Sequence, residues 1–165
     1  MPSDPREELR HVYQFHCGYC GTSEVDVGAL LTIDHFQPRA RGGPDDPANW
    51  VYCCHACNEF KGDYWQPDSS YRILHPLQDD LATRIAEEAD GRLRGLTETG
   101  TFHIQRLHLN RPQLIAHRLA RRINSEIRHA LVAQQQEETT QLQRLAELEE
   151  ALQAALQRLA QMRQR

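Results

Sequence analysis

The spacing of hydrophobic and polar positions changes along the chain, and each change predicts an element. Residues 4–14 fit a short helix that begins with a capping aspartate and a proline. The run at 28–33 is compact and largely apolar, which predicts a buried strand ending at Asp34 and His35. Residues 36–49 are rich in Pro, Gly and Asp and follow neither the helical nor the strand periodicity of apolar residues, so they predict a surface loop.

The segment after this loop predicts a return strand and then a helix. Residues 50–53 suit a short strand, and residues 58–61 suit a helical turn closed by Gly62. The order from residue 28 onwards is therefore strand, long loop, strand and helix.

A hairpin signal follows this unit. The Asp-Gly pair at 90–91 predicts a turn between strands at 83–89 and 92–97. We expect a third extended piece at 102–107, after a Thr-Gly turn.

The C-terminal third predicts a long amphipathic helix, because no glycine or proline follows Pro112. Large apolar residues recur there every three or four positions: Leu142, Leu145, Leu148, Leu152, Leu156, Leu159 and Met162. From residue 113 such a helix would reach about 80 Å if unbroken. We therefore expect it to fold back near 134–140 as a hairpin, or to dock on a partner as a coiled coil. The predicted domains are 1–111 and 112–165.

The overall composition is ordinary, and the position of the charges along the chain is more informative than their sum. The 165 residues are 39% hydrophobic and carry a net charge of −4. Because no long apolar run and no signal peptide are visible, we expect a cytoplasmic protein without a membrane span. The stretch 101–130 holds six arginines and one acid, and it could contact phosphates or form a solvated helix face.

Four of the five cysteines form two C-x-x-C pairs, Cys17 with Cys20 and Cys54 with Cys57. Two such pairs are typical of a structural zinc site, in which four thiolates close the coordination sphere to water. Cys53 is left over. We interpret it as a small buried residue on a strand, although an exchange of register with Cys54 stays open.

The segment from Asp34 to Gly62 reads DHFQPRARGGPDDPANWVYCCHACNEFKG, which resembles the HNH nuclease motif. The resemblance implies a ββα-metal finger with a structural zinc site. Together with the small β-hairpin and the long helical C-terminal region predicted above, this gives an α+β fold. By position, it implies that Asp34 and Asn58 are metal ligands, that His35 is the general base, and that Asn49 braces the loop and helps orient the base. Asn58 replaces the more usual histidine, which moves the site toward oxygen ligands.

Hydrolysis of a phosphodiester bond requires a base and a cation, and the same residues can supply the base and bind the cation. An imidazole suits the removal of a proton from water at neutral pH, which is the work assigned to His35. A carboxylate and an amide oxygen, from Asp34 and Asn58, suit Mg²⁺ or Mn²⁺, whereas the thiolates suit Zn²⁺. Three further cations in the motif could bind DNA phosphates or simply be exposed: Arg39, Arg41 and Lys61.

The motifs GLTETG at 95–100 and LHLNR at 107–111 are similar to those of HNH proteins from retron and Septu-type anti-phage systems. That resemblance implies a DNA-cutting effector of anti-phage defence that works with an SMC-like ATPase. A homo-oligomer formed through the C-terminal helices is the other partner hypothesis. The alternative function is a non-catalytic zinc module that binds DNA or protein.

Overall fold

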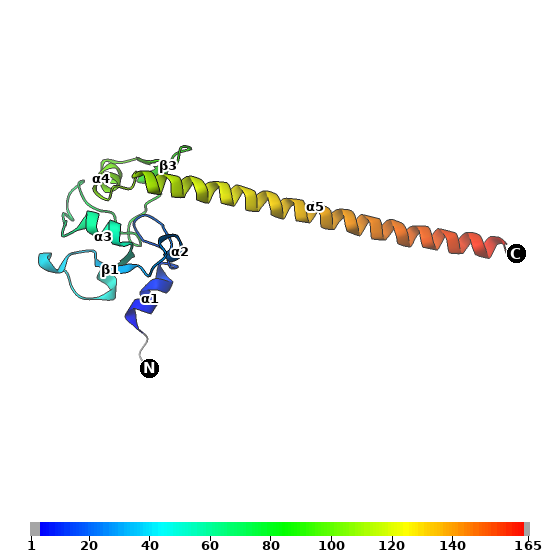
Figure 1. The fold of residues 1–165 in the computed structure, drawn as a ribbon, viewed down its shortest axis with the longest axis horizontal. Helices are drawn as coiled ribbons and strands as arrows, with labels where there is room; N and C mark the ends of the chain where they lie inside the picture. The colour runs from blue at the N-terminus through cyan, green and yellow to red at the C-terminus, as the bar shows by residue number, and fades with distance from the viewer. Residues whose placement is uncertain (1–3, 164–165) are drawn as a thin grey trace. The chain divides into compact units, whose positions relative to one another are not determined.

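The computed structural model describes residues 4–163 and divides the chain into two compact units, Met1–Leu119 and Ala120–Arg165. We describe each unit by itself. In chain order the elements are α1 (Pro5–Val12), α2 (Glu24–Val27), β1 (Thr32–His35), β2 (Trp50–Cys53), α3 (His55–Lys61), β3 (Ile85–Glu87), β4 (Leu93–Gly95), α4 (Glu98–Arg106) and α5 (Pro112–Arg163) (Figure 1). Two short 3₁₀ turns, Arg39–Arg41 and Pro47–Asn49, lie in the long loop.

The antiparallel pair β1–β2 and the helix α3 form the ββα unit that carries the motif. The register places Asp34 opposite Val51 and His35 opposite Trp50. The return strand and the helix end at Gly62 agree with the sequence-based prediction. The first strand is shorter than predicted, because Gly28 adopts a positive φ and ends a helical turn, α2, that the apolar pattern did not indicate.

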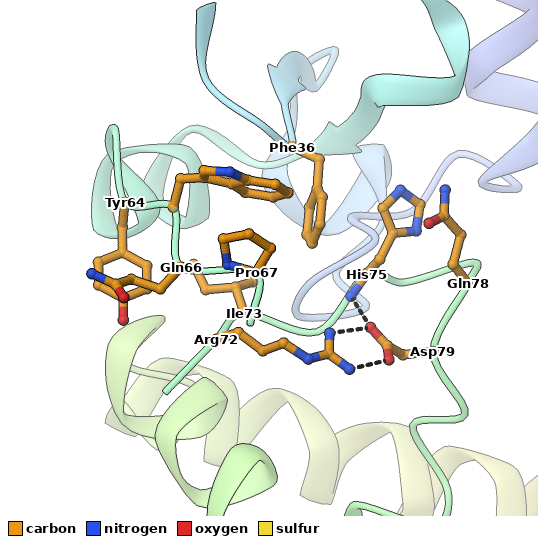
Figure 2. A pocket seen from close by; sticks show the side chains of 10 residues that line it. Phe36, Tyr64, Gln66, Pro67, Arg72, Ile73, His75, Gln78 and Asp79 are labelled. Carbon is orange, nitrogen blue, oxygen red and sulfur yellow. Dashed lines mark hydrogen bonds and ion pairs between the residues drawn. The ribbon is translucent and has the colours of Figure 1, made fainter. Parts of the chain in front are cut away.

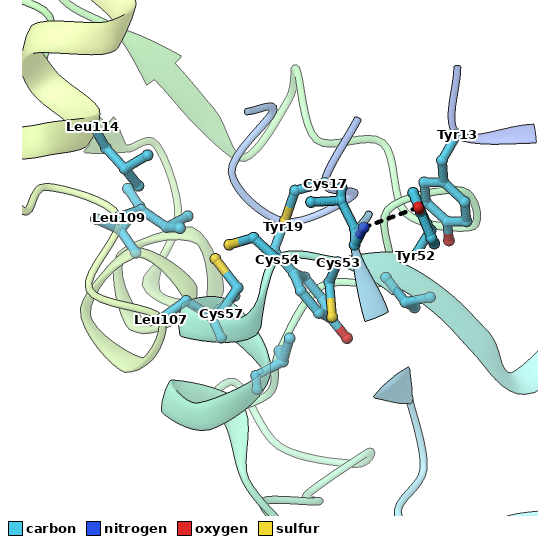
Figure 3. Packing of buried hydrophobic residues seen from close by; sticks show 14 of the residues in the cluster. Tyr13, Cys17, Tyr19, Tyr52, Cys53, Cys54, Cys57, Leu107, Leu109 and Leu114 are labelled. Carbon is cyan, nitrogen blue, oxygen red and sulfur yellow. Dashed lines mark hydrogen bonds between the residues drawn. The ribbon is translucent and has the colours of Figure 1, made fainter. Parts of the chain in front are cut away.

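The core of the first unit lies between β2, α3 and the segments around α1 and α4. Val51, Tyr52, Cys53 and Leu107 have no exposed surface, and Tyr52 belongs to this core together with Tyr13 and Tyr19 (Figure 3). The Tyr52 hydroxyl accepts a hydrogen bond from the backbone N–H of Leu31 (3.0 Å). Helix α1 packs on β2 through this core and is capped by Asp4, as predicted.

The second hairpin, β3–β4, is present as predicted but shorter, with Gly91 at φ 79° in its turn. The extended piece predicted at 102–107 is wrong, because these residues belong to helix α4 and its C-cap. Thr97 caps this helix by accepting from the N–H of Gly100 (3.0 Å). A Cβ at Gly100 would lie 2.0 Å from the carbonyl oxygen of Arg84, so close packing rather than a turn requires glycine there.

In the second unit the chain is helical through Arg163, without a turn at 134–140. The predicted helical hairpin is therefore wrong, whereas docking on a partner stays a prediction. The apolar stripe is exposed, with relative exposures of 57% at Leu145 and 60% at Leu152. No helix among the described residues is both long enough and apolar enough to cross a membrane. The fold is α+β, with small antiparallel hairpins and a long C-terminal helix, as predicted.

Candidate functional site

The four cysteines of the two C-x-x-C pairs meet at one point. Their sulfur atoms all lie within 4.8 Å of one another, and the sulfurs of Cys20 and Cys54 are 3.7 Å apart. Tetrahedral zinc with bonds of about 2.3 Å spaces its thiolates about 3.8 Å apart. Among the described residues, this is the only group of three or more His, Cys, Asp or Glu side chains close enough for a shared ion. The cluster is therefore positioned to bind a metal, and its donors fit structural zinc.

The electrostatics of the cluster favour thiolates at two positions. Hydrogen bonding to Cys17 lowers the pKa of Cys20 to about 7, and it lowers the pKa of Cys54 still further. The Arg111 guanidinium donates to Cys57 Sγ (3.8 Å). Since four thiolates around a divalent ion carry a net charge of −2, this arginine offsets part of the excess.

Cys53 lies outside the cluster, as predicted. It is fully buried on β2, and burial raises the pKa of its thiol well above the usual range. Its position one residue before Cys54 puts its side chain on the other face of the strand end. Cys53 is therefore a packing residue.

Helix α3 links the cluster to the rest of the motif. Cys54, Cys57, Asn58 and Lys61 are spaced as i, i+3, i+4 and i+7, which places them along one face of the helix. Two of them point to the sulfur cluster and Lys61 reaches β1. The side-chain amide of Asn58 is half-buried on the same face, and it has no hydrogen-bond partner among the described residues.

Asp34 and Lys61 form a buried ion pair between β1 and α3. Lys61 Nζ donates to Asp34 Oδ1 (2.9 Å) and to the backbone carbonyl of His35 (2.9 Å), while the Tyr19 hydroxyl donates to Asp34 Oδ2 (2.7 Å). Lys61 has no exposed surface, so the expectation that it contacts a DNA phosphate is wrong for this arrangement. Burial raises the pKa of Asp34, although Lys61 and Tyr19 act to lower it.

His35 contacts a different carboxylate. Its Nε2 lies 2.8 Å from Asp45 Oδ1, and the Trp50 indole N–H donates to the same oxygen (3.2 Å). The Arg39 guanidinium is 3.5 Å from Asp45 Oδ2. Hydrogen bonding to His35 is the main reason why the pKa of Asp45 is lowered. No sequence pattern indicates Asp45, because it is one of two adjacent aspartates in a loop and its partner is ten residues away.

Asn49 braces the loop between the two strands. Its side-chain oxygen accepts from the N–H of Gln37 (2.8 Å), and its Nδ2 donates to the carbonyls of Gln37 (3.0 Å) and Pro44 (2.8 Å). A Cβ at Gly43 would lie 1.8 Å from the Gln37 carbonyl oxygen, which shows how tightly the loop closes. This clamp fixes the stretch that carries Asp45.

The structure thus arranges the predicted site residues in two groups. Asp34 lies toward α3 with Lys61, while His35, its neighbour on the strand, points to the opposite side and meets Asp45. Arg39 and Arg41 are exposed on the loop.

Three of the six arginines at 101–130 make contacts inside the first unit that no local sequence pattern indicates. Arg106 donates to the Lys61 carbonyl (2.9 Å), and Arg118, which is 3% exposed, donates to the Gly91 carbonyl (2.6 Å). Arg111 lies beside the cysteines. These three contacts stabilise the fold and leave a smaller basic surface than the sequence suggested.

A ββα unit with a four-thiolate cluster at the base of its helix is the architecture of a small metal-dependent finger. Residues 17–64 match the model of the HNH endonuclease family, which covers both cysteine pairs, both strands and α3. No curated protein and no solved structure matches the chain. The match supports a nuclease domain with a nucleic acid as substrate.

We predict that Cys57→Ser prevents stoichiometric zinc binding and unfolds the finger, because structural zinc contributes directly to folding free energy. The matched control is Cys53→Ala, which removes a buried thiol outside the cluster and should keep the zinc. Native mass spectrometry and thermal unfolding measure both effects. A full complement of zinc in Cys57→Ser would contradict the assignment.

Proposed function

We propose that this chain is a metal-dependent endonuclease that hydrolyses DNA phosphodiester bonds with His35 as the general base. The observation that carries the proposal is the His35–Asp45 contact at 2.8 Å. A carboxylate accepts hydrogen bonds, so the imidazole Nε2 must carry a proton and, in neutral His35, Nδ1 keeps a lone pair. A half-exposed histidine held in this state can accept a proton from water.

The chemical step then follows from this tautomer. His35 Nδ1 takes a proton from a water molecule, the water oxygen bonds to phosphorus, and the bond from phosphorus to O3′ breaks. The leaving oxygen gains a proton from solvent. Asp45 stabilises the imidazolium that forms, and Trp50 and Arg39 hold Asp45 in position. Asp45 acts through His35 and is a positioning residue.

Asp34 and Asn58 would hold the catalytic Mg²⁺ or Mn²⁺. A carboxylate offers about four acceptor positions, and Lys61 and Tyr19 use two of those on Asp34. The Asn58 amide lies on the same face of α3 as Lys61, which reaches Asp34. The donor set of one carboxylate and one amide oxygen fits such an ion. When bound, the ion would neutralise charge on the phosphate and on the leaving oxygen.

The non-catalytic zinc module is the less favoured function. A binding module needs the cysteine cluster but has no use for a histidine held by a carboxylate beside a second, buried carboxylate. The three arginines with internal contacts also weaken the argument for a basic binding helix.

We predict that His35→Ala lowers the rate of plasmid cleavage in Mg²⁺ by about 100-fold or more, as expected for loss of a general base. The matched control is His55→Ala, since that side chain is 82% exposed and, among the described residues, pairs with Glu59 alone. Reactions without added Mg²⁺ should be inactive while zinc stays bound. Equal cleavage by His35→Ala and wild type would rule out His35 as the base.

We predict that Asp45→Ala lowers kcat about 10- to 100-fold, as loss of a supporting partner does, with little change in KM. The exposed Asp63→Ala is the control. Nitrogen-15 NMR of neutral His35 should show the Nε2–H tautomer in wild type and a mixture in Asp45→Ala. A wild-type histidine protonated at Nδ1 instead would contradict the contact.

We further propose that the nuclease is an effector of anti-phage defence and acts in the cytoplasm under the control of a partner. Five free cysteines suit a reducing compartment. The exposed stripe on α5 supports helix docking, because Leu145, Leu152 and Leu159 recur every seven residues. A second copy of the chain is the simplest occupant, and an SMC-like ATPase, implied only by resemblance, is the other.

We predict that wild type has the mass of a dimer by light scattering at micromolar concentration, and that Leu145→Asp with Leu152→Asp reduces it to one chain. Each substitution places a charge in the apolar seam. The control pair is Gln143→Asp with Gln153→Asp, at neighbouring polar positions. A monomeric wild type would exclude self-association and leave the partner ATPase as the occupant.

A further inference from the structure

A cavity of about 280 Å³ adjoins the motif and takes no part in the mechanism above. Four of its ten lining residues carry aromatic or proline rings: Phe36, Tyr64, Trp65 and Pro67. Figure 2 labels three of them, Phe36, Tyr64 and Pro67. The Phe36 ring meets that of Trp65 edge to face, with centroids 5.6 Å apart and planes at 86°. Both side chains are half-buried, so part of their ring surface remains open.

The polar groups of the cavity cancel in charge. Arg72 donates to both oxygens of Asp79 (2.8 and 2.5 Å), and the N–H of His75 donates to Asp79 as well (2.8 Å). These contacts raise the pKa of Arg72 and lower that of Asp79, so both stay charged. Burial lowers the pKa of His75, which favours its neutral form. An anion such as a free phosphate would find no unpaired cation here.

Two amides complete the lining. Gln66 and Gln78 are exposed at the cavity, and their side chains have no hydrogen-bond partner among the described residues. A glutamine amide presents a donor and an acceptor side by side, which is the arrangement that pairs with the edge of a base. Flat apolar walls, zero net charge and free amides together suit an uncharged heteroaromatic ring.

The position of the cavity suggests where that ring comes from. Phe36 directly follows His35, and consecutive Cα atoms lie about 3.8 Å apart. The Tyr64–Pro67 wall begins three residues after Lys61, which contacts the backbone of His35. Neighbouring side chains at a strand end point to opposite sides, so the cavity lies across the end of β1 from the His35 imidazole. A strand of DNA rises about 3.4 Å per nucleotide, and a strand cut beside His35 would place a neighbouring base near this strand end.

We propose that this cavity binds an unpaired nucleobase of the DNA beside the cut, and that the enzyme therefore prefers single-stranded or locally unpaired substrate. A base inside a duplex is stacked and paired on both sides, so only an unpaired or extruded base can enter. The inference deepens the proposed function, on which it rests.

The test measures binding separately from cutting, with His35→Ala as the parent protein so that the probe stays intact. Fluorescence anisotropy compares a short labelled oligothymidylate with an abasic strand of the same length and charge. Trp65→Ala should weaken binding of the oligothymidylate about 5- to 100-fold, since one stacked base contributes about 1–3 kcal/mol. Binding of the abasic strand should not change. Tyr71→Ala, an exposed aromatic outside the cavity lining, is the matched control.

Several outcomes would overturn the proposal: equal binding of the two strands by the parent, an equal loss for both strands in Trp65→Ala, or base-dependent binding of an RNA strand only. Zinc content and thermal unfolding check that Trp65→Ala is folded, and Trp65→Leu replaces it if it is not. Cleavage of duplex and single strands by wild type is measured in parallel. Base-dependent binding without any cleavage would refute the nuclease activity and leave the cavity assignment standing. Duplex cleavage that Trp65→Ala leaves unchanged would refute the cavity assignment and leave the nuclease activity standing.

Discussion

The four-thiolate cluster is the constraint on which the rest of the structure depends. Helix α3 has seven residues, far too few to be stable by itself in water. The cluster ties its first turn to the Cys17–Cys20 turn, two segments more than thirty residues apart in the chain. Because Asn58 and Lys61 share the helix face that the cysteines orient, fixing the sulfurs also fixes what α3 presents to β1. A metal held by these thiolates would thereby determine how α3 presents Asn58 and Lys61 to β1.

The Asp34–Lys61 pair shows the cost of placing a carboxylate in this position. Asp34 is 5% exposed and Lys61 is fully enclosed, so both charges are desolvated and each depends on the other. Removing one partner of such a pair typically costs about 3–5 kcal/mol, because the remaining charge is buried alone. Tyr19 donates a further hydrogen bond to Asp34, and the His35 carbonyl accepts one from Lys61. The strand end is therefore held on one side by a buried polar network and is half-open on the other, where His35 lies.

The sequence predicted the features with a local signal: the C-x-x-C spacing, the β2 strand, the Gly62 helix end and the Asp90-Gly91 hairpin. It failed where long-range packing overrides local pattern. The Thr-Gly pair at 99–100 predicts a turn, whereas Gly100 lies within a helix and is required there by the close approach of the Arg84 carbonyl. Lys61 and Arg118 looked like surface cations because nothing in their neighbours reveals burial. Asp45 was missed because a proline- and glycine-rich loop gives no register that would bring it to His35.

The hydrogen bonds of Asn49 divide the long loop into two parts that differ in how well they tolerate changes of length and sequence. The Asn49 side chain bonds to both Gln37 and Pro44, so the residues between them form a smaller loop whose two ends are fixed. Since the entropy of closing a loop grows slowly with its length, the tip at 40–42 can be lengthened at small cost as long as Arg39 keeps its contact with Asp45. The residues that follow the clamp, Asp45 and Trp50, cannot shift without moving the partner of the imidazole. The loop thus divides into a tip that tolerates changes of length and a base, held by Asn49, that keeps Asp45 beside His35.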